Sequence, residues 1–140
     1  MTPTDTQIIT RKAKFIQEDL DRLAEYHHIT QKDYLKDYDT QLKVERLLEK
    51  IVGRVIDINY HLLKTKYQSI PVDYFESFTD LASYKELPHD LANQLAPAAG
   101  LRNALAHEYD YLDPKQVYAA ISLALTQIPK YLSFIFKQLK

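Results

Sequence analysis

Apolar residues recur along four segments of the chain at alternating spacings of three and four, which puts them on one face of an α-helix. The repeating positions are Ile9, Ala13, Ile16, Leu20 and Leu23; Val44, Leu48, Ile51, Val55, Ile58 and Leu62; Leu91, Leu95, Ala98, Arg102, Leu105 and Tyr109; and Val117, Ile121, Leu125, Ile128, Leu132, Ile135 and Leu139. No stretch alternates apolar and polar residues for long, so no sheet is expected. The pattern predicts an all-α, up-and-down bundle of four main helices plus one short helix.

Helix start and stop signals separate these segments. The first helix is expected to end at residues 27–29, and the hydroxyl of Thr30 can cap the second helix. The sequence Ser69-Ile70-Pro71 should end the second helix, because proline lacks an amide proton and restricts the residue before it. A short helix is expected over residues 73–83, before the third main helix begins.

Prolines mark the last two main helices. Pro88 suits the first turn of the third helix, where an amide proton has no partner within the helix. Asp113 followed by Pro114 predicts the cap and the first residue of the last helix. Pro129 falls inside that helix and should kink it.

Length and composition limit the class of protein. The 140 residues predict one domain, 1–140, large enough to bury a substantial core. The absence of cysteine excludes disulfides and thiolate metal sites and fits a reducing cytoplasm. Residues 1–5 lack the basic and then apolar pattern of a secretory signal, and no apolar run approaches the ~18 residues of a membrane span. We therefore expect a soluble, cytoplasmic protein that contacts no membrane.

The formal net charge of −1 restricts how the chain can bind nucleic acid. A broad, non-specific grip usually needs a basic face, so any contact with RNA must be local. The sequence holds no Gly-rich phosphate loop, no paired-carboxylate dyad and no histidines at metal-ligand spacing. We therefore expect no metal and no cofactor.

The ten residues from Gly100 to Tyr109 hold a cation, an amide, an imidazole and a phenol, a set that a helical bundle does not need. Arg102 and Tyr109 stand where the repeat calls for an apolar residue, and their spacing of seven places them on one helix face. Asn103 and His107, four apart, share a neighbouring face. Arg102 and His107 lie about 140° apart around the helix. They converge on one phosphate if the long arginine side chain reaches, or if the helix loosens or forms a π-bulge.

Each of these residues also has a structural interpretation. Arg102 could pair with a buried carboxylate such as Asp57, which could instead be exposed or support a cleft. His107 could be a histidine at a helix C-terminus, where a cation is favoured. Tyr109 could be one of the eleven tyrosines that only pack. Taken singly, structural roles are commoner than catalytic ones.

Taken together, the side chains suit cleavage of RNA, which carries its own nucleophile in the 2′-hydroxyl. Imidazole can move a proton near neutral pH, so His107 can serve as the base. Arg102 can clamp the phosphate in a forked geometry and stabilise the charged transition state. One histidine cannot be base and acid in the same step. We therefore hypothesise a two-fold dimer whose shared cleft takes one His107 from each chain.

The string from Gly100 to Tyr109 resembles the Arg-x4-His-x-Tyr signature of the HepT toxins, which belong to the HEPN superfamily of all-α proteins. The lead-in Gly100-Leu101 and the polar Asn103 match as well. The long second helix, with Ile-Asp-Ile-Asn-Tyr-His-Leu-Leu at 56–63, and the apolar last helix extend the similarity over most of the chain. The sequence is thus identified as a single HEPN-like helical domain.

This resemblance implies a metal-independent RNA endonuclease that is the toxin of a type II toxin–antitoxin pair. It implies that Arg102 and His107 are the active residues and that Asn103 supports them. It also implies that a cognate minimal nucleotidyltransferase antitoxin uses ATP to attach AMP to Tyr109, which silences the nuclease; Tyr111 lies close enough to compete. The alternative is a non-catalytic helical partner or substrate-binding subunit of a nucleotidyltransferase.

Overall fold

A computed structural model describes residues 1–107 and 112–139 of the chain. The described residues form α-helices and a single 3₁₀ turn, and they contain no strand, which confirms the predicted all-α class. The helices are α1 (Pro3–Leu23), α2 (Gln31–Lys36), α3 (Tyr38–Tyr67), α4 (Tyr74–Ser83), α5 (His89–Leu95), α6 (Ala98–His107) and α7 (Pro114–Gln138), with the 3₁₀ turn at Ala24–Tyr26.

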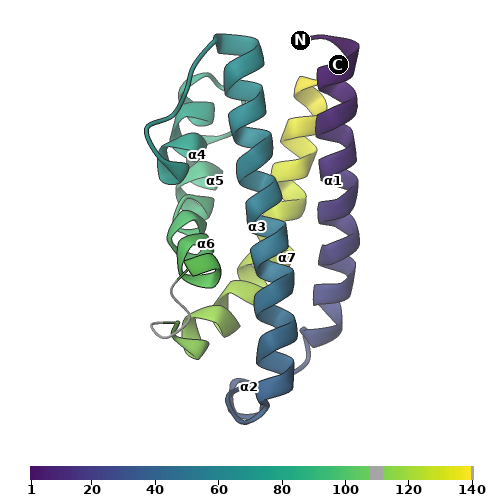
Figure 1. Ribbon diagram of the computed structural model, residues 1–140, viewed down its shortest axis with the longest axis vertical. Coiled ribbons are helices and arrows are strands. Elements are labelled where there is room, and N and C mark those ends of the chain that lie inside the picture. Colours follow the sequence, from purple (N-terminus) through teal and green to yellow (C-terminus); the bar gives the residue numbers. More distant parts are fainter. Residues whose placement is uncertain (108–111, 140) are drawn as a thin grey trace.

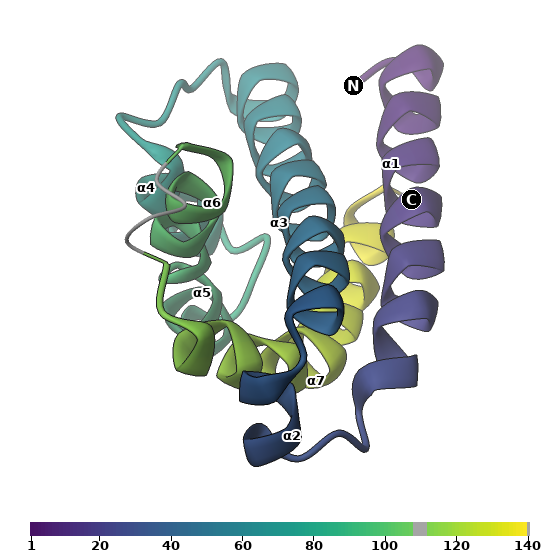
Figure 2. The same ribbon diagram turned by 60° about the horizontal axis from the view of Figure 1, so that its bottom comes forward.

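The long helix α3 is the centre of the bundle and contacts α1, α4, α6 and α7. Figure 1 shows α1 along one side of α3, and α4, α5 and α6 in a column along the other side. The last helix, α7, crosses the bundle and contacts α1, α2, α3 and α5. Figure 2 shows that α6 lies in the same layer as α4 and α5, away from α1. This arrangement places α6 against α3 and α4, so that polar residues of α6 lie next to polar residues of these two helices.

The apolar repeat predicts the core well. All the repeat positions of α1 and α3 are buried, from Ile9 to Leu23 and from Val44 to Leu62. In α7 the repeat is buried except at Leu125 and Leu139, which are half-buried and pack against the same core. In α6 the repeat reaches the core through Leu105, while Arg102 is half-buried at its edge. The interruption in the pattern therefore marks a surface position.

The prediction of one continuous second helix is wrong, because the chain breaks at Asp37. The Thr30 hydroxyl does cap a helix, accepting from the Asp33 amide at 3.1 Å, but that helix is the short α2. The Asp37 carboxylate then accepts from the amide and hydroxyl of Thr40, at 3.1 and 2.7 Å, and starts α3. An aspartate that bonds the following backbone favours a new helix start over continuation.

The predicted third main helix is also two helices, α5 and α6, separated at Pro97. Proline has no amide proton for the α5 ladder, and its ring disfavours a helical residue before it. Two short-range bonds bridge the break, from the Ala99 amide to the Ala96 carbonyl and from Gly100 to Pro97, at 3.0 and 3.1 Å. Pro88 precedes α5 as its N-cap residue and does not lie in its first turn. The break gives α6 its own direction, toward α4.

The first helix ends earlier than predicted, at Leu23 followed by the 3₁₀ turn Ala24–Tyr26, and the remaining boundary predictions are confirmed. The short helix predicted over 73–83 is α4, capped by the Asp73 carboxylate. Asp113 caps α7, accepting from the Lys115 amide at 2.9 Å, and Pro114 is the first residue of the helix. Pro129 lies inside α7, and the ribbon of α7 changes direction along its length in Figures 1 and 2.

Within the described residues, α7 is the one helix whose length and average hydropathy would suit a membrane span, although the sequence has no uninterrupted apolar run of that length. Glutamine, serine and threonine interrupt its apolar residues without lowering the average below that of a span. The seam of α7 faces the interior, with Val117, Ile121 and Ile128 buried against the other helices. About 33% of the apolar stretch of α7 is buried in this way.

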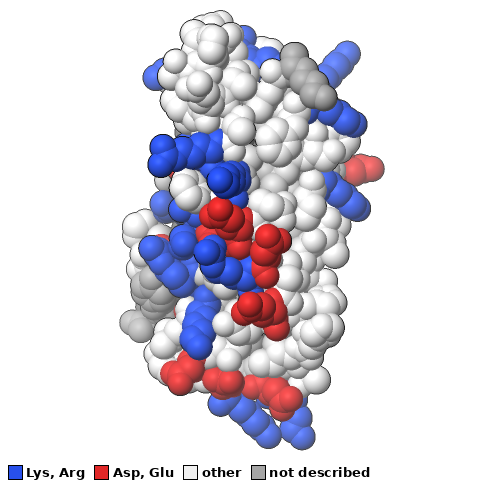
Figure 3. Space-filling view, turned by 90° about the vertical axis from the view of Figure 1, so that its right-hand side faces the viewer, with Lys and Arg blue, Asp and Glu red and all other residues white. Residues whose placement is uncertain are grey.

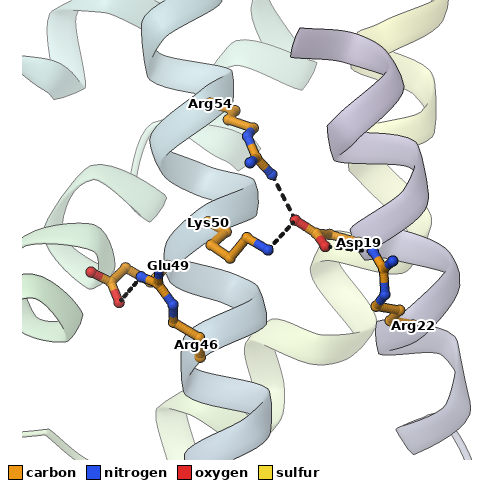
Figure 4. Close-up of polar contacts among 6 residues, drawn as sticks. All are labelled: Asp19, Arg22, Arg46, Glu49, Lys50 and Arg54. Carbon is orange, nitrogen blue, oxygen red and sulfur yellow. Dashed lines mark hydrogen bonds and ion pairs between the residues drawn. The ribbon is translucent and has the colours of Figure 1, made fainter. Parts of the chain in front are cut away.

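Charged side chains form a mixed band on the side of the molecule that includes α1 (Figure 3). Cations and carboxylates alternate in this band, and a wide uncharged area lies beside it. On the α1–α3 contact, the buried carboxylate of Asp19 pairs with Arg22, Lys50 and Arg54 at 3.0, 3.5 and 2.8 Å (Figure 4). The guanidinium of Arg54 also lies 4.9 Å from the ring centroid of Phe15. These contacts fasten α1 to α3.

Candidate functional site

The polar residues of the sequence motif lie on α6, and two of them meet. The Arg102 Nη1 atom lies 3.4 Å from the Nε2 atom of His107. A guanidinium has only donors, so a hydrogen bond between the two groups requires Nε2 of His107 to be the acceptor. His107 is exposed at the last residue of α6, and Arg102 is half-buried five residues earlier. The structure thus brings together the pair on which the sequence hypothesis depends.

The long arginine side chain, rather than a helix irregularity, closes the gap between these two positions. The α-helical hydrogen-bonding pattern of α6 continues to His107, and no π-bulge occurs in it. Residues five apart point about 140° from each other on a regular helix. Arg102 must therefore extend along the helix surface to reach the imidazole. This is the first of the alternatives predicted from the sequence, a long arginine side chain that reaches.

An aromatic ring from another helix holds Arg102 in place. The Cζ atom of Arg102 lies 5.1 Å from the ring centroid of Tyr74, in the first turn of α4. Tyr74 in turn meets the ring of Tyr60 on α3 edge-to-face, with centroids 5.9 Å apart. Burial, then Tyr74 and then the charge of Asp73 raise the pKa of Tyr60, so its phenol stays neutral near neutral pH. The arginine therefore lies against an aromatic ring, where a cation is favoured.

A pocket of about 330 Å³ lies beside Arg102, between α3, α4 and α6. Its lining residues are Gly53, Ile56, Asp57, Tyr60, Tyr74 and Arg102. The pocket therefore contains both a cation and a carboxylate, from different helices, and two phenol rings. Its walls bring Arg102 of the α6 motif together with side chains of α3 and α4.

The suggestion that Arg102 pairs with a buried Asp57 is wrong. Asp57 is exposed on α3, and its ion pair is with Lys12 of α1 at 3.5 Å. The apolar neighbours of Asp57 in the sequence belong to the buried face of α3, and the carboxylate itself projects from the opposite side of the same turn. Asp57 nevertheless lines the pocket next to Arg102. This position fits the alternative prediction that Asp57 supports a cleft. Within 1–107 and 112–139, no carboxylate forms an ion pair with Arg102.

Of the other predicted site residues, the structure describes only Asn103. Asn103 is exposed on α6 next to Arg102, and in the described part of the chain its side chain makes no hydrogen bond. Tyr109, the predicted modification site, and Tyr111, its competitor, lie outside the described residues. The role of each of these three residues stays a prediction.

Two residues of the site, Tyr60 and Tyr74, do not follow from the sequence motif. Asp57 and Tyr60 are three apart on α3 and so share a face, which was a usable signal. Tyr74 has no such signal, because it reaches Arg102 only through the packing of α4 against α6. With eleven tyrosines in the chain, residue type alone does not single it out.

The arrangement can bind a phosphate and accept a proton at one place. The guanidinium of Arg102 can donate two parallel hydrogen bonds to phosphate oxygens. A phosphate that takes over these donors frees Nε2 of His107, which can then accept a proton from a nearby hydroxyl. A hydroxyl next to a phosphodiester is the group that RNA offers and DNA lacks.

Comparisons with known proteins point to the same chemistry. Residues 16–135 match the family model described as ribonuclease HepT-like. The tRNA nuclease HepT of Aphanizomenon flos-aquae is 44% identical over 131 residues, which cover 94% of this chain and 89% of the relative. The mRNA nuclease HepT of Shewanella oneidensis is 26% identical over 102 residues, covering 73% of this chain and 77% of the relative.

A solved structure shows the same fold. The tri-AMPylated HEPN toxin of Shewanella oneidensis, in complex with an MNT antitoxin, superposes with a TM-score of 0.83 at 25% sequence identity. The match covers 98% of this chain and 99% of that one. The breaks at Asp37 and Pro97 therefore belong to a bundle that agrees over nearly its full length with a known toxin.

Proposed function

This chain belongs to the HepT-like ribonuclease family, and from that membership we propose that it is a metal-independent RNA endonuclease, the toxin of a toxin–antitoxin pair that acts in the cytoplasm. The observation that carries the proposal is the 3.4 Å approach of Arg102 to His107 on one helix end. The relatives named as nucleases and the antitoxin-bound structure support it.

The reaction begins with the 2′-hydroxyl next to the cleaved linkage. His107 takes the proton of this hydroxyl through Nε2 while the oxygen attacks phosphorus. A bond forms between the 2′-oxygen and phosphorus, the bond to the 5′-oxygen breaks, and the leaving oxygen takes up a proton. The products are a 2′,3′-cyclic phosphate and a free 5′-hydroxyl, and the step needs no metal or cofactor to balance.

Arg102 holds the phosphate through this step. Charge gathers on the non-bridging oxygens in the transition state, and a guanidinium fixed beside them stabilises it. Tyr74 fixes that guanidinium from below, 5.1 Å from its Cζ atom. Asn103, exposed on the next position of α6, supplies a further hydrogen-bonding group toward the RNA. Asp57 supports the cleft from α3.

A second copy of the chain completes the site. The leaving oxygen needs an acid at the same time as the 2′-hydroxyl needs a base, and one imidazole cannot be both. His107 ends α6 in an exposed position, so a two-fold axis near this end would bring the two copies together. The proposed homodimer therefore has a composite cleft with one histidine from each chain.

The proposed antitoxin is a minimal nucleotidyltransferase that transfers AMP from ATP to Tyr109. The Tyr109 oxygen attacks the α-phosphorus of ATP, its proton is lost, and pyrophosphate leaves. The attached phosphate would occupy Arg102, and the nucleoside would block RNA. The tri-AMPylated state of the Shewanella oneidensis toxin supports this form of control.

Cleavage by the purified protein in the presence of a chelator tests the nuclease. We expect wild-type cleavage to persist with the chelator, and Arg102→Ala and His107→Ala each to lose it. Intact RNA in all three samples, with a stable antitoxin complex, would instead indicate a non-catalytic partner.

Two further measurements test the dimer and the modification. Mixed dimers with one His107→Ala chain should lose most of their activity, and nearly full activity per dimer would contradict a shared cleft. Intact mass of the protein incubated with the antitoxin and ATP should rise by whole AMP units. Tyr109→Phe should abolish this rise and Tyr111→Phe should not; the reverse result would move the modification to Tyr111.

A further inference from the structure

The pocket beside Arg102 contains groups that phosphate binding does not use. Two phenol rings and a carboxylate, from Tyr60, Tyr74 and Asp57, form much of its wall. Its volume of about 330 Å³ lies at the lower end of the range for small-molecule sites, about 300–1,000 Å³. A pocket of this size next to a phosphate-binding cation is suited to one nucleotide unit of an RNA strand.

The aromatic groups suit a nucleobase. Proteins that recognise single-stranded RNA stack its bases on aromatic rings and on arginine planes. Tyr74 lies under Arg102, and its edge-to-face contact with Tyr60 makes a corner of two rings in the same pocket. Both rings are half-buried, so a base can reach them without displacing the core.

The carboxylate of Asp57 determines which base would fit. A carboxylate repels the RNA backbone, but Lys12 lies 3.5 Å from it on the side of α1 and offsets its charge. An ionised carboxylate only accepts hydrogen bonds, and its two oxygens accept two donors side by side. Guanine presents such a pair on its Watson–Crick edge, N1–H and the N2 amino group. The other three bases place an acceptor next to each donor on this edge.

We propose that this pocket receives a guanine next to the cleaved linkage, stacked against Tyr60 and Tyr74, with Asp57 accepting from its Watson–Crick edge. This inference rests on the proposed endonuclease activity and adds base selectivity to it. Arg102 then holds the phosphate and Asp57 reads the neighbouring base, both from the lining of one pocket.

Short RNAs that differ only in the base beside the cut test the assignment. Wild-type protein should cut the guanine substrate faster than the uracil substrate. Asp57→Asn keeps the size of the side chain but turns one acceptor into a donor, so this ratio should fall about tenfold or more. Lys12→Met removes the same ion pair without altering the pocket wall, and it should keep the guanine preference.

The stacking contact has its own matched pair of variants. Tyr74→Phe keeps the ring and should raise KM for the guanine substrate far less than loss of the ring does. Tyr74→Leu removes the ring and should raise KM about tenfold, since stacking contributes appreciably for each base. Equal KM values for these two variants would contradict the stacking role.

Titration of the uncleaved protein with 5′-GMP and 5′-UMP gives a readout that needs no cleavage. GMP should shift the ring NMR signals of Tyr60 and Tyr74 at lower concentration than UMP does, and Asp57→Asn should remove the difference. Equal responses to both nucleotides would overturn the proposal, as would equal loss of base preference in Asp57→Asn and Lys12→Met. If the protein cuts no RNA, the endonuclease proposal fails, and the GMP titration still decides whether the pocket selects guanine.

Discussion

Arg54 and Arg102 are both half-buried arginines beside an aromatic ring, yet their surroundings are opposite. Arg54 is 2.8 Å from Asp19, a carboxylate that is 1% exposed and shared with two further cations (Figure 4). Arg102 forms no ion pair within the described residues and faces the imidazole of His107. One guanidinium fastens two helices together, and the other keeps its donors available for a ligand.

This difference shows how a small bundle separates stability from chemistry. The buried Asp19 and Asn59 side chains are satisfied by other parts of the protein, as is usual for buried polar groups. At the end of α6, donors and acceptors remain exposed, and the helix is fixed instead by Leu105 in the core and by Tyr74 beneath the arginine. Substitutions of the buried polar groups should therefore reduce stability, and substitutions of the exposed polar groups at the end of α6 should reduce activity.

The largest stability loss is expected for Asp19→Ala. It leaves Lys50 and Arg54 facing each other across the α1–α3 contact without their carboxylate. We expect about 3 kcal/mol, at the lower end of the cost for breaking a buried pair, because the cations can still turn toward water. Urea unfolding measures it, with Asp21→Ala on the exposed face of α1 as the control. Equal urea unfolding midpoints for the two variants would show that Asp19 does not hold α1 against α3.

Tyr131→Phe should cost less, about 1–3 kcal/mol. The buried Tyr131 hydroxyl donates to Asn59 Oδ1 at 2.6 Å, and Asn59 donates to the Ser77 hydroxyl at 3.1 Å. Removing the hydroxyl keeps the ring but leaves the Asn59 oxygen without a partner in the junction of α3, α4 and α7. Thermal and urea unfolding should both show the loss, with cleavage unchanged in the folded protein. A neutral result would mean that the network does not hold these helices together.

Tyr67 should make stability depend on pH in the alkaline range. Burial, and then its hydrogen bond to the buried Glu86, raise the pKa of Tyr67 to about 12. An unfolded tyrosine titrates near ~10. Between these values the unfolded chain has lost the proton and the folded chain keeps it, so the contribution is complete below pH ~10 and is lost as pH rises toward ~12. Wild-type stability should therefore fall more steeply over this range than that of Tyr67→Phe; parallel curves would contradict it.

The smallest effect on stability is expected for Arg102→Ala. The variant loses the contact with Tyr74, which is worth about 1 kcal/mol. Alanine is a good helix former, so α6 itself should persist. Urea unfolding should place this variant close to the wild type although it does not cut RNA. A loss as large as that of Asp19→Ala would mean that Arg102 is structural, and the contrast between the two arginines would disappear.

Much of the fold follows from the sequence, because the apolar repeat depends on local geometry. Every repeat position of α1 and α3 is buried, and the Asp113-Pro114 start of α7 is confirmed. The breaks at Asp37 and Pro97 were not predicted, although a capping aspartate and a proline stand there. The repeat runs across Pro97 with unchanged spacing, so periodicity alone favours one continuous helix there. It begins only at Val44, after Asp37, and so does not register the first break.

The site was predictable only where its residues are close in sequence. Arg102 and His107 lie on one helix, and their approach could be inferred from the reach of arginine. Tyr74, the support of Arg102, comes from another helix, and the α6 motif contains nothing that specifies it. The ion pair of Asp57 with Lys12 depends on the packing of α1 against α3, which the sequence pattern does not resolve at the level of single side chains.

A double-mutant cycle on RNA cleavage tests most directly whether Arg102 and His107 act on the same linkage. Arg102→Ala and His107→Ala should each lower the cleavage rate by about 10²–10⁴. Because both residues would serve one transition state, the cleavage rate of the double variant should be little lower than that of the less active single variant. Losses that multiply in the double variant, or wild-type cleavage in either single variant, would contradict a shared site.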